Sequence, residues 1–193
     1  MFAKTRRNIN KSCELQTGFN IIELLVIIVV IGILASIITV NYGGAQAKSR
    51  DSERTSEAKA IEAALESYRS KNTGYPPSST ATQVAGASTG GWETSGAAQP
   101  GTFISALKPL GFPTGTPSDP TNNTLADSGN TYRYKTFTAG SNGCDATKGD
   151  YYVFIVNNLE TVSGASPQSS GFSCSGHNWQ TDGDYAFGRF VNE

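Results

Sequence analysis

A single apolar stretch near the N-terminus constrains this chain more than any other part of its sequence. It runs from Phe19 to Val40 and holds one charged residue, Glu23. As a helix rising about 1.5 Å per residue, the stretch would be roughly 33 Å long, enough to cross the hydrocarbon core of a bilayer. The sequence therefore predicts a membrane-crossing helix over residues 19–40.

The charges before this stretch predict its orientation. Basic residues outnumber acidic ones in residues 1–18, which contain Lys4, Arg6, Arg7, Lys11 and Glu14. A basic flank stays on the cytoplasmic side, so everything after Val40 should be exported. An ordinary secretory signal is cut after its apolar region, at small residues. Here the expected cutting point, Gly18-Phe19, lies before the apolar region.

The residues around this point carry a specific resemblance. Residues 17–25 read TGFNIIELL, and this segment resembles the class III signal of type IV pilins and type II secretion pseudopilins. In that family a prepilin peptidase cuts after the glycine. The resemblance therefore implies cleavage between Gly18 and Phe19, N-methylation of Phe19, and a glutamate, Glu23, as the fifth residue of the mature chain.

Glu23 is unusual on physical grounds alone. An ionised carboxylate inside a bilayer costs at least about 2–3 kcal/mol, so it needs a partner or a functional reason. Cleavage after Gly18 would supply the ammonium group of Phe19, and in the family this pairing is thought to join one subunit to the next. The alternative is that Glu23 lies near the helix end and reaches the interface unpaired.

The resemblance also implies an architecture. The fold class is α+β, the ladle of type IV pilins: a long N-terminal helix, membrane-spanning in its first half, packed against a small antiparallel sheet. Residues 1–18 would be the leader and 19–40 the transmembrane and assembly helix. Residues 41–74 would be the soluble amphipathic half of the helix, and 75–193 the exported head, with a variable loop at 76–101.

Charge and cysteine usage agree with export. Removal of the leader changes 15 basic and 16 acidic residues to 11 and 15, a net charge of −4 that indicates no affinity for nucleic acid. Cys13 would leave with the leader, and an oxidising compartment favours a disulfide between Cys144 and Cys174, worth roughly 3–4 kcal/mol for a loop of about thirty residues. Metal ligation is the alternative, but His177 is the only histidine.

The second half of the helix shows a mixed pattern. Paired glycines at Gly43-Gly44 predict a weak point. Farther on, apolar residues recur at helical spacing and should lie on the head: Ile61, Ala64, Leu65 and Tyr68. Opposite charges three residues apart predict that the rest of this half is a solvated helix face, on which some charges of residues 48–57 could pair between subunits. The pairs within the helix are Arg50 with Glu53, Asp51 with Arg54, Arg54 with Glu57, Lys59 with Glu62, and Glu66 with Arg69.

The remaining residues predict the head. Residues 78–101 are rich in small polar residues and predict a surface loop. Three strands follow: 131–138, which alternates and should have one wet face; 150–157, apolar on both faces and therefore central; and 185–191. The long helix should end before these strands, at Asn72-Thr73-Gly74.

Catalytic chemistry is not indicated. His177 has no neighbouring nucleophile in the sequence, and no phosphate-binding loop, dinucleotide fingerprint or zinc spacing is present. The chain is therefore not expected to be an enzyme or to need a cofactor. The arrangement of loop aspartates resembles that of the major pseudopilin of type II secretion, which implies calcium held by hard oxygen ligands. The spacing matches no calcium motif, and solvated side chains are the alternative. The candidate ligands are Asp119, Asp127, Asp145 and Asp150.

Two classes of function remain. The favoured one is a pilin that polymerises through its N-terminal helix into a cell-surface pilus for adhesion, motility or DNA uptake, with a type II secretion pseudopilin as the alternative. A single-pass, membrane-anchored binding domain is more remote. The resemblance implies a bacterial cytoplasmic-membrane protein, N-terminus inside, before assembly. Its partners would be other pilin copies, prepilin peptidase, membrane lipid, and a membrane platform with ATPase-driven assembly machinery.

Overall fold

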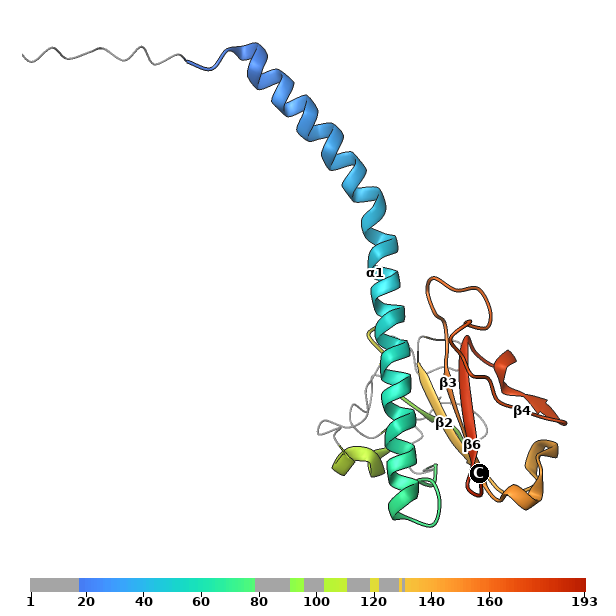
Figure 1. Cartoon of the computed structure of the whole chain (residues 1–193). Helices are drawn as coiled ribbons and strands as arrows, with labels where there is room; N and C mark the ends of the chain where they lie inside the picture. The colour runs from blue at the N-terminus through green and yellow to red at the C-terminus, as the bar shows by residue number, and fades with distance from the viewer. Residues whose placement is uncertain (1–17, 79–90, 96–102, 111–118, 122–128, 130) are drawn as a thin grey trace, which may run out of the picture. The chain divides into compact units, whose positions relative to one another are not determined.

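The computed structural model describes residues 18–78, 91–95, 103–110, 119–121, 129 and 131–193, and only the backbone of residues 37–41. The chain forms two units, one ending at Gly43 and one beginning at Gly44. Helix α1 (Ile21–Lys71) contributes to both (Figure 1). It is helical at Gly43 and Gly44, where the sequence predicts a weak point.

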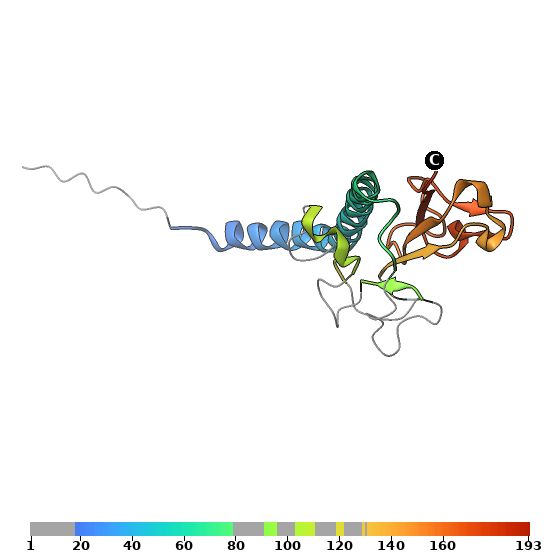
Figure 2. The same ribbon diagram turned by 90° about the horizontal axis from the view of Figure 1, so that it is seen from below.

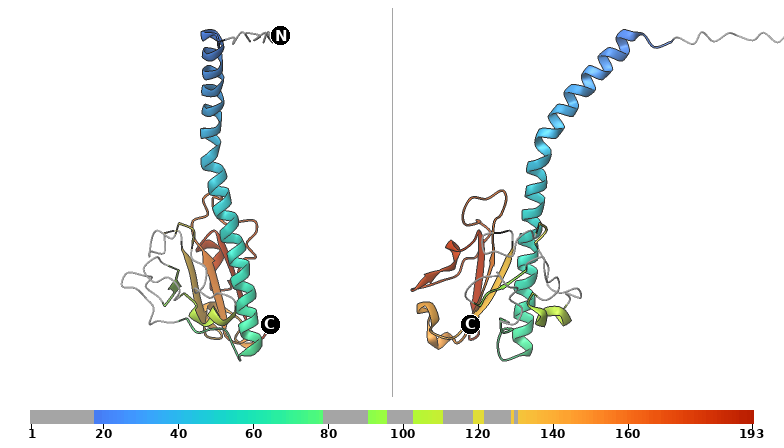
Figure 3. Two further views of the ribbon diagram at one scale, coloured as in Figure 1. Left: turned by 90° about the vertical axis from the view of Figure 1, so that its left-hand side faces the viewer. Right: turned by 180° about the vertical axis from the view of Figure 1, so that it is seen from behind.

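The second unit is built on a four-stranded antiparallel sheet. Its strand order is β1 (Glu93–Thr94), β2 (Tyr132–Phe137), β3 (Tyr151–Val156) and β6 (Tyr185–Phe190). The second half of α1 lies along one side of the sheet, and a hairpin of β4 (Ser173–Cys174) and β5 (His177–Asn178) lies on the other (Figures 2 and 3). This arrangement confirms the predicted α+β class.

Within the described part of the second unit there are also short 3-10 helices: η2 (Ser105–Leu110), η3 (Ser141–Gly143), η4 (Ala146–Lys148) and η5 (Trp179–Thr181). Helix α1 ends at Lys71, directly before Asn72, as predicted. The predicted loop 78–101 is interrupted by β1, which extends the sheet next to β2, while residues 79–90 and 96–101 of that loop lie outside the described residues.

Apolar side chains cover both faces of the sheet. On the α1 side, Ile61 and Leu65 are fully buried against tyrosine and phenylalanine rings of β2 and β3, including Tyr134 and Phe154. This contact confirms the predicted helix face. On the opposite side, a second cluster forms around Trp179. All six residues of β3 are therefore buried, as expected for a central strand.

The predicted wet face of β2 was wrong at Arg133, which is only 8% exposed. The second apolar cluster extends over this face and brings the Trp92 ring to 5.3 Å from the guanidinium carbon of Arg133. The charge is accommodated because its Nη2 donates hydrogen bonds to the carbonyl oxygen of Asp182 at 2.6 Å and to Asn157 Oδ1 at 3.2 Å.

The disulfide between Cys144 and Cys174 is present, as predicted. It joins the turn after β2 to the hairpin of β4 and β5. Backbone contacts around it are close: an added Cβ at Gly176 would lie 2.6 Å from the carbonyl oxygen of Asn142. Only glycine allows the hairpin to approach the turn so closely.

Candidate processing and assembly site

The residues expected to be cleaved precede the helix. Gly18, Phe19 and Asn20 are non-helical and exposed. Among the described residues, no atom beyond the neighbours of Gly18 lies within 4 Å of a Cβ built on it, and Phe19 is 85% exposed. No described part of the chain therefore covers the peptide bond between Gly18 and Phe19.

A capping interaction starts α1 directly after this bond. The side-chain Oδ1 of Asn20 accepts a hydrogen bond from the backbone N–H of Ile22 at 3.3 Å, and Glu23 Oε2 accepts one from the backbone N–H of Asn20 at 3.0 Å. This reciprocal pair is a capping box, which satisfies backbone donors at the first turn. Glu23 therefore has a local partner in the uncleaved chain, while its role in assembly stays a prediction.

The first half of α1 and the residue Phe19 before it present an apolar surface that no described residue covers. The large apolar side chains from Phe19 to Leu34 are between 46% and 85% exposed. A continuous apolar surface of this kind is a site of association with other apolar matter.

No helical segment within the described residues is both long enough and apolar enough to span a bilayer.

A buried ion cluster ties α1 to two loops of the second unit. Arg54 has a side chain that is 0% exposed, and its Nε and Nη2 donate to the two carboxylate oxygens of Asp119 at 2.7 and 3.0 Å. Its Nη1 donates to Asp51 and to Glu160, each at 2.8 Å. Arg50 donates to Glu160 from the preceding turn. The predicted solvated face was therefore wrong at Arg54, although its predicted pairing with Asp51 is confirmed.

Asp51 binds a loop as well as Arg54. Its carboxylate accepts hydrogen bonds from the backbone N–H groups of Glu160 at 2.9 Å and Thr161 at 2.8 Å, and from the Thr161 hydroxyl at 2.7 Å. Burial opposes its ionisation, but these bonds and Arg54 leave the pKa of Asp51 below its usual value. Hydrogen bonds from Arg50 and then Arg54 lower the pKa of Glu160 to about 2, against partial desolvation.

Only some of the other predicted charge pairs are present in the described residues. The pair of Glu66 with Arg69 is confirmed at 3.2 Å. Glu57 instead accepts a hydrogen bond from the Tyr132 hydroxyl, and burial raises the pKa of Glu57. Glu62 lies 3.6 Å from Arg189, not beside Lys59. The charges on this part of α1 thus connect the helix to its own head.

The calcium candidates serve separate local roles. Asp119 binds Arg54, Asp145 caps η4 through the backbone N–H of Thr147, and Asp150 accepts a hydrogen bond from the backbone N–H of Ala139. Asp127 lies outside the described residues. Within the described ranges, no three His, Cys, Asp or Glu side chains are grouped as metal ligands would be. Calcium binding stays untested.

His177 lies on β5, not in a loop. Its Nε2 is 2.8 Å from Asp182 Oδ2, and its ring packs beside Trp179 with centroids 4.8 Å apart. Through these contacts, His177 helps to hold the hairpin of β4 and β5 against η5.

Comparison with known proteins identifies relatives of one kind. Type II secretion system core protein G of Aeromonas hydrophila is 39% identical over 61 residues, and the proteins of the same name from Escherichia coli (strain K12) and Vibrio cholerae are each 36% identical over 66 residues. Over these residues the chain is similar to members of the type IV pilin and pseudopilin family. No family model matches the chain, and no solved structure matches it significantly.

Similarity to these members of the pilin and pseudopilin family is partial. The matches cover 32–34% of this chain and 43–46% of each of the three relatives. The chain thus spans less than half the length of the curated relatives it matches, and what it assembles with is a matter for proposal.

Proposed function

We propose that this chain is a structural subunit of a type II secretion pseudopilus. The observation that carries the proposal is that its curated relatives are named as the core protein G of that system. The relatives favour this function over the cell-surface pilus preferred from the sequence. A non-enzymatic role agrees with the exposed apolar half of α1, which offers a surface for association and no reactive group.

Maturation is proposed to begin at the accessible bond before the helix. Hydrolysis between Gly18 and Phe19 leaves a carboxylate on the leader and an amino group on Phe19. The neutral amine then takes a methyl group from a methylsulfonium donor, which leaves as the thioether, and the N-methyl amine is protonated to an ammonium group. Before assembly, residues 19–40 lie in the cytoplasmic membrane with the second unit outside. During assembly the apolar side chains exchange lipid contacts for contacts with other copies.

Glu23 is proposed to set the register between copies. Its carboxylate binds the Phe19 ammonium group of a neighbouring subunit inside an apolar bundle. Breaking such a pair by removing one partner leaves an unpaired charge, which costs roughly 3–5 kcal/mol in a buried setting. Glu23→Val should therefore leave processed subunit in the membrane but produce few fibres.

The test is complementation of a strain that lacks this gene. Gly18→Val should accumulate uncleaved precursor, whereas Glu23→Val should accumulate processed monomer, and both should abolish release of exported enzymes into the medium. Asn20→Ser is the matched control, because serine also caps helices. Loss of surface adhesion or motility with normal secretion would favour a pilus instead, and normal assembly of Glu23→Val would refute the role proposed for Glu23.

A further inference from the structure

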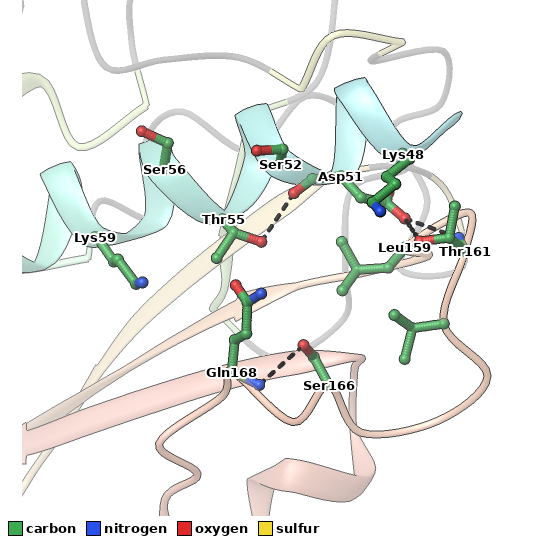
Figure 4. Close-up of a pocket in the computed structure, with 11 residues that line it drawn as sticks. Lys48, Asp51, Ser52, Thr55, Ser56, Lys59, Leu159, Thr161, Ser166 and Gln168 are labelled. Carbon is green, nitrogen blue, oxygen red and sulfur yellow. Dashed lines mark hydrogen bonds between the residues drawn. The ribbon is translucent and has the colours of Figure 1, made fainter. Parts of the chain in front are cut away.

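A groove lies between α1 and the loop formed by residues 159–168. It has a volume of about 400 Å³, and apolar side chains from the loop, Leu159 and Val162, line one wall (Figure 4). The helix wall carries small hydroxyl residues and two lysines, Lys48 and Lys59. Both lysines are exposed to solvent.

The charge available in this groove is positive. Neither Lys48 nor Lys59 has an ion-pair partner among the described residues. Glu62, the predicted partner of Lys59, lies beside Arg189 instead. Asp51 also borders the groove, but its carboxylate is already bonded to Arg54 and the loop. A ligand of this groove would therefore need exposed negative charge.

The same loop borders a second hollow with the opposite charge. This hollow, of about 470 Å³, is lined by Gly164 and Ala165 of the loop and by residues 180–184, which include Asp182 and Asp184. Asp182 has only His177 as an ion-pair partner among the described residues. Asp184 accepts a hydrogen bond from the backbone N–H of Leu159 through Oδ2. Arg133 bonds the carbonyl oxygen of Asp182, not its carboxylate.

We propose that the loop 159–168 is a contact ridge between successive copies of this chain. Lys48 and Lys59 of one copy face Asp182 and Asp184 of the next. The two hollows share no lining residue, so a contact between them joins different surfaces of the two copies. Such a heterologous contact, if its rotation does not close, propagates into a filament, whereas a contact of one surface with itself stops at a dimer.

This inference rests on the proposed function in one respect, that copies of the chain polymerise. It adds a second contact, between exported heads, to the one between N-terminal helices. Complementary charges at such a contact fix register and speed association more than they add affinity. The head contact therefore selects which surfaces meet, while the apolar helices provide most of the attraction.

Charge reversal in the full-length chain tests the ridge. Lys59→Glu and Asp182→Lys should each reduce fibre yield about tenfold, because each places like charges opposite one another. The double variant Lys59→Glu/Asp182→Lys restores opposite charges and should recover most of the yield. Lys71→Glu is the matched control, since this exposed lysine lies on the same helix outside the groove. Normal fibres from both single variants, or no recovery in the double variant, would overturn the inference.

Cross-linking gives a readout independent of yield. The variant Lys59→Cys/Asp182→Cys, oxidised in assembled fibres, should form a ladder of dimers, trimers and larger species. Dimers alone, or no cross-linked species in intact fibres, would refute a head-to-tail contact while leaving the proposed function in place. Failure of the unaltered chain to form fibres would overturn both.

Discussion

Arg54→Met is the substitution with the largest predicted effect on the second unit. Methionine keeps the length and apolar part of the side chain but removes the guanidinium group. Three carboxylates lose a donor, yet they are not equally affected. Asp51 keeps its bonds to the loop at Glu160 and Thr161, and Glu160 keeps Arg50.

The loss in free energy of unfolding that Arg54→Met causes depends mainly on Asp119. Its side chain is 0% exposed, and after the substitution the backbone N–H and hydroxyl of Thr121 still donate to it, but no guanidinium group does so in the described residues' ion pairs. Removing one partner of a buried ion pair typically costs 3–5 kcal/mol, because the remaining charge stays buried. We expect Arg54→Met to lower the free energy of unfolding by about 4 kcal/mol.

Chemical denaturation of the full-length chain in detergent, followed by the fluorescence of buried Trp179, measures this change. The double variant Arg54→Met/Asp119→Asn removes both charges and should recover about half of the loss, as expected for coupled partners. Arg50→Gln serves as the control, because the Arg50 side chain is 32% exposed and its loss should matter far less. A loss below about 1 kcal/mol for Arg54→Met, or a double variant no more stable than the single one, would refute the argument.

Three further predictions concern the same unit. Acid should destabilise it: the pKa of Glu160 is lowered from 4.5 to about 2, so its stabilisation is complete above 4.5 and is lost as the pH falls toward 2. Glu160→Gln should flatten the dependence of the unfolding midpoint on pH over this range, and an unchanged slope would contradict the assignment. Cys144→Ser/Cys174→Ser opens a loop with a sequence separation of 30 and should cost about 3 kcal/mol by denaturation, with a loss under about 1 kcal/mol as the contrary result. Tyr152→Phe should stabilise by about 1 kcal/mol, because the buried Tyr152 hydroxyl has no hydrogen-bond partner in the described structure, and a lower unfolding midpoint would indicate otherwise.

Local periodicity was enough to predict the main elements of the second unit. The spacing of Ile61 and Leu65 identified the buried helix face, and the apolar run of β3 identified the central strand. The end of α1 at Lys71 followed from the Asn-Thr-Gly sequence after it. In each case the responsible signal lies within a few residues of the feature it predicts.

Features that depend on distant partners could not be predicted in this way. Arg54 looks like any other charge on a polar helix face, and its partners Asp119 and Glu160 are 65 and 106 residues away. Strand β1 has two residues, too few to show a period. Arg133 is buried because a tryptophan from a preceding loop covers it.

The capping box could have been predicted from the sequence. Asn20 and Glu23 stand three residues apart, directly before an apolar helix, which is the spacing of that motif. Glu23 thus has this local role beside the assembly role that the family resemblance implies. The two roles are compatible, because a carboxylate accepts several hydrogen bonds.

The N-terminus of the protein recovered from assembled fibres tests the central claim most directly. Mass spectrometry of its N-terminal peptide should show a chain that begins at Phe19, with a methyl group on the amine. A chain that begins at Met1 in assembled material would contradict the account, because Glu23 would then have no free ammonium group to bind in the next copy.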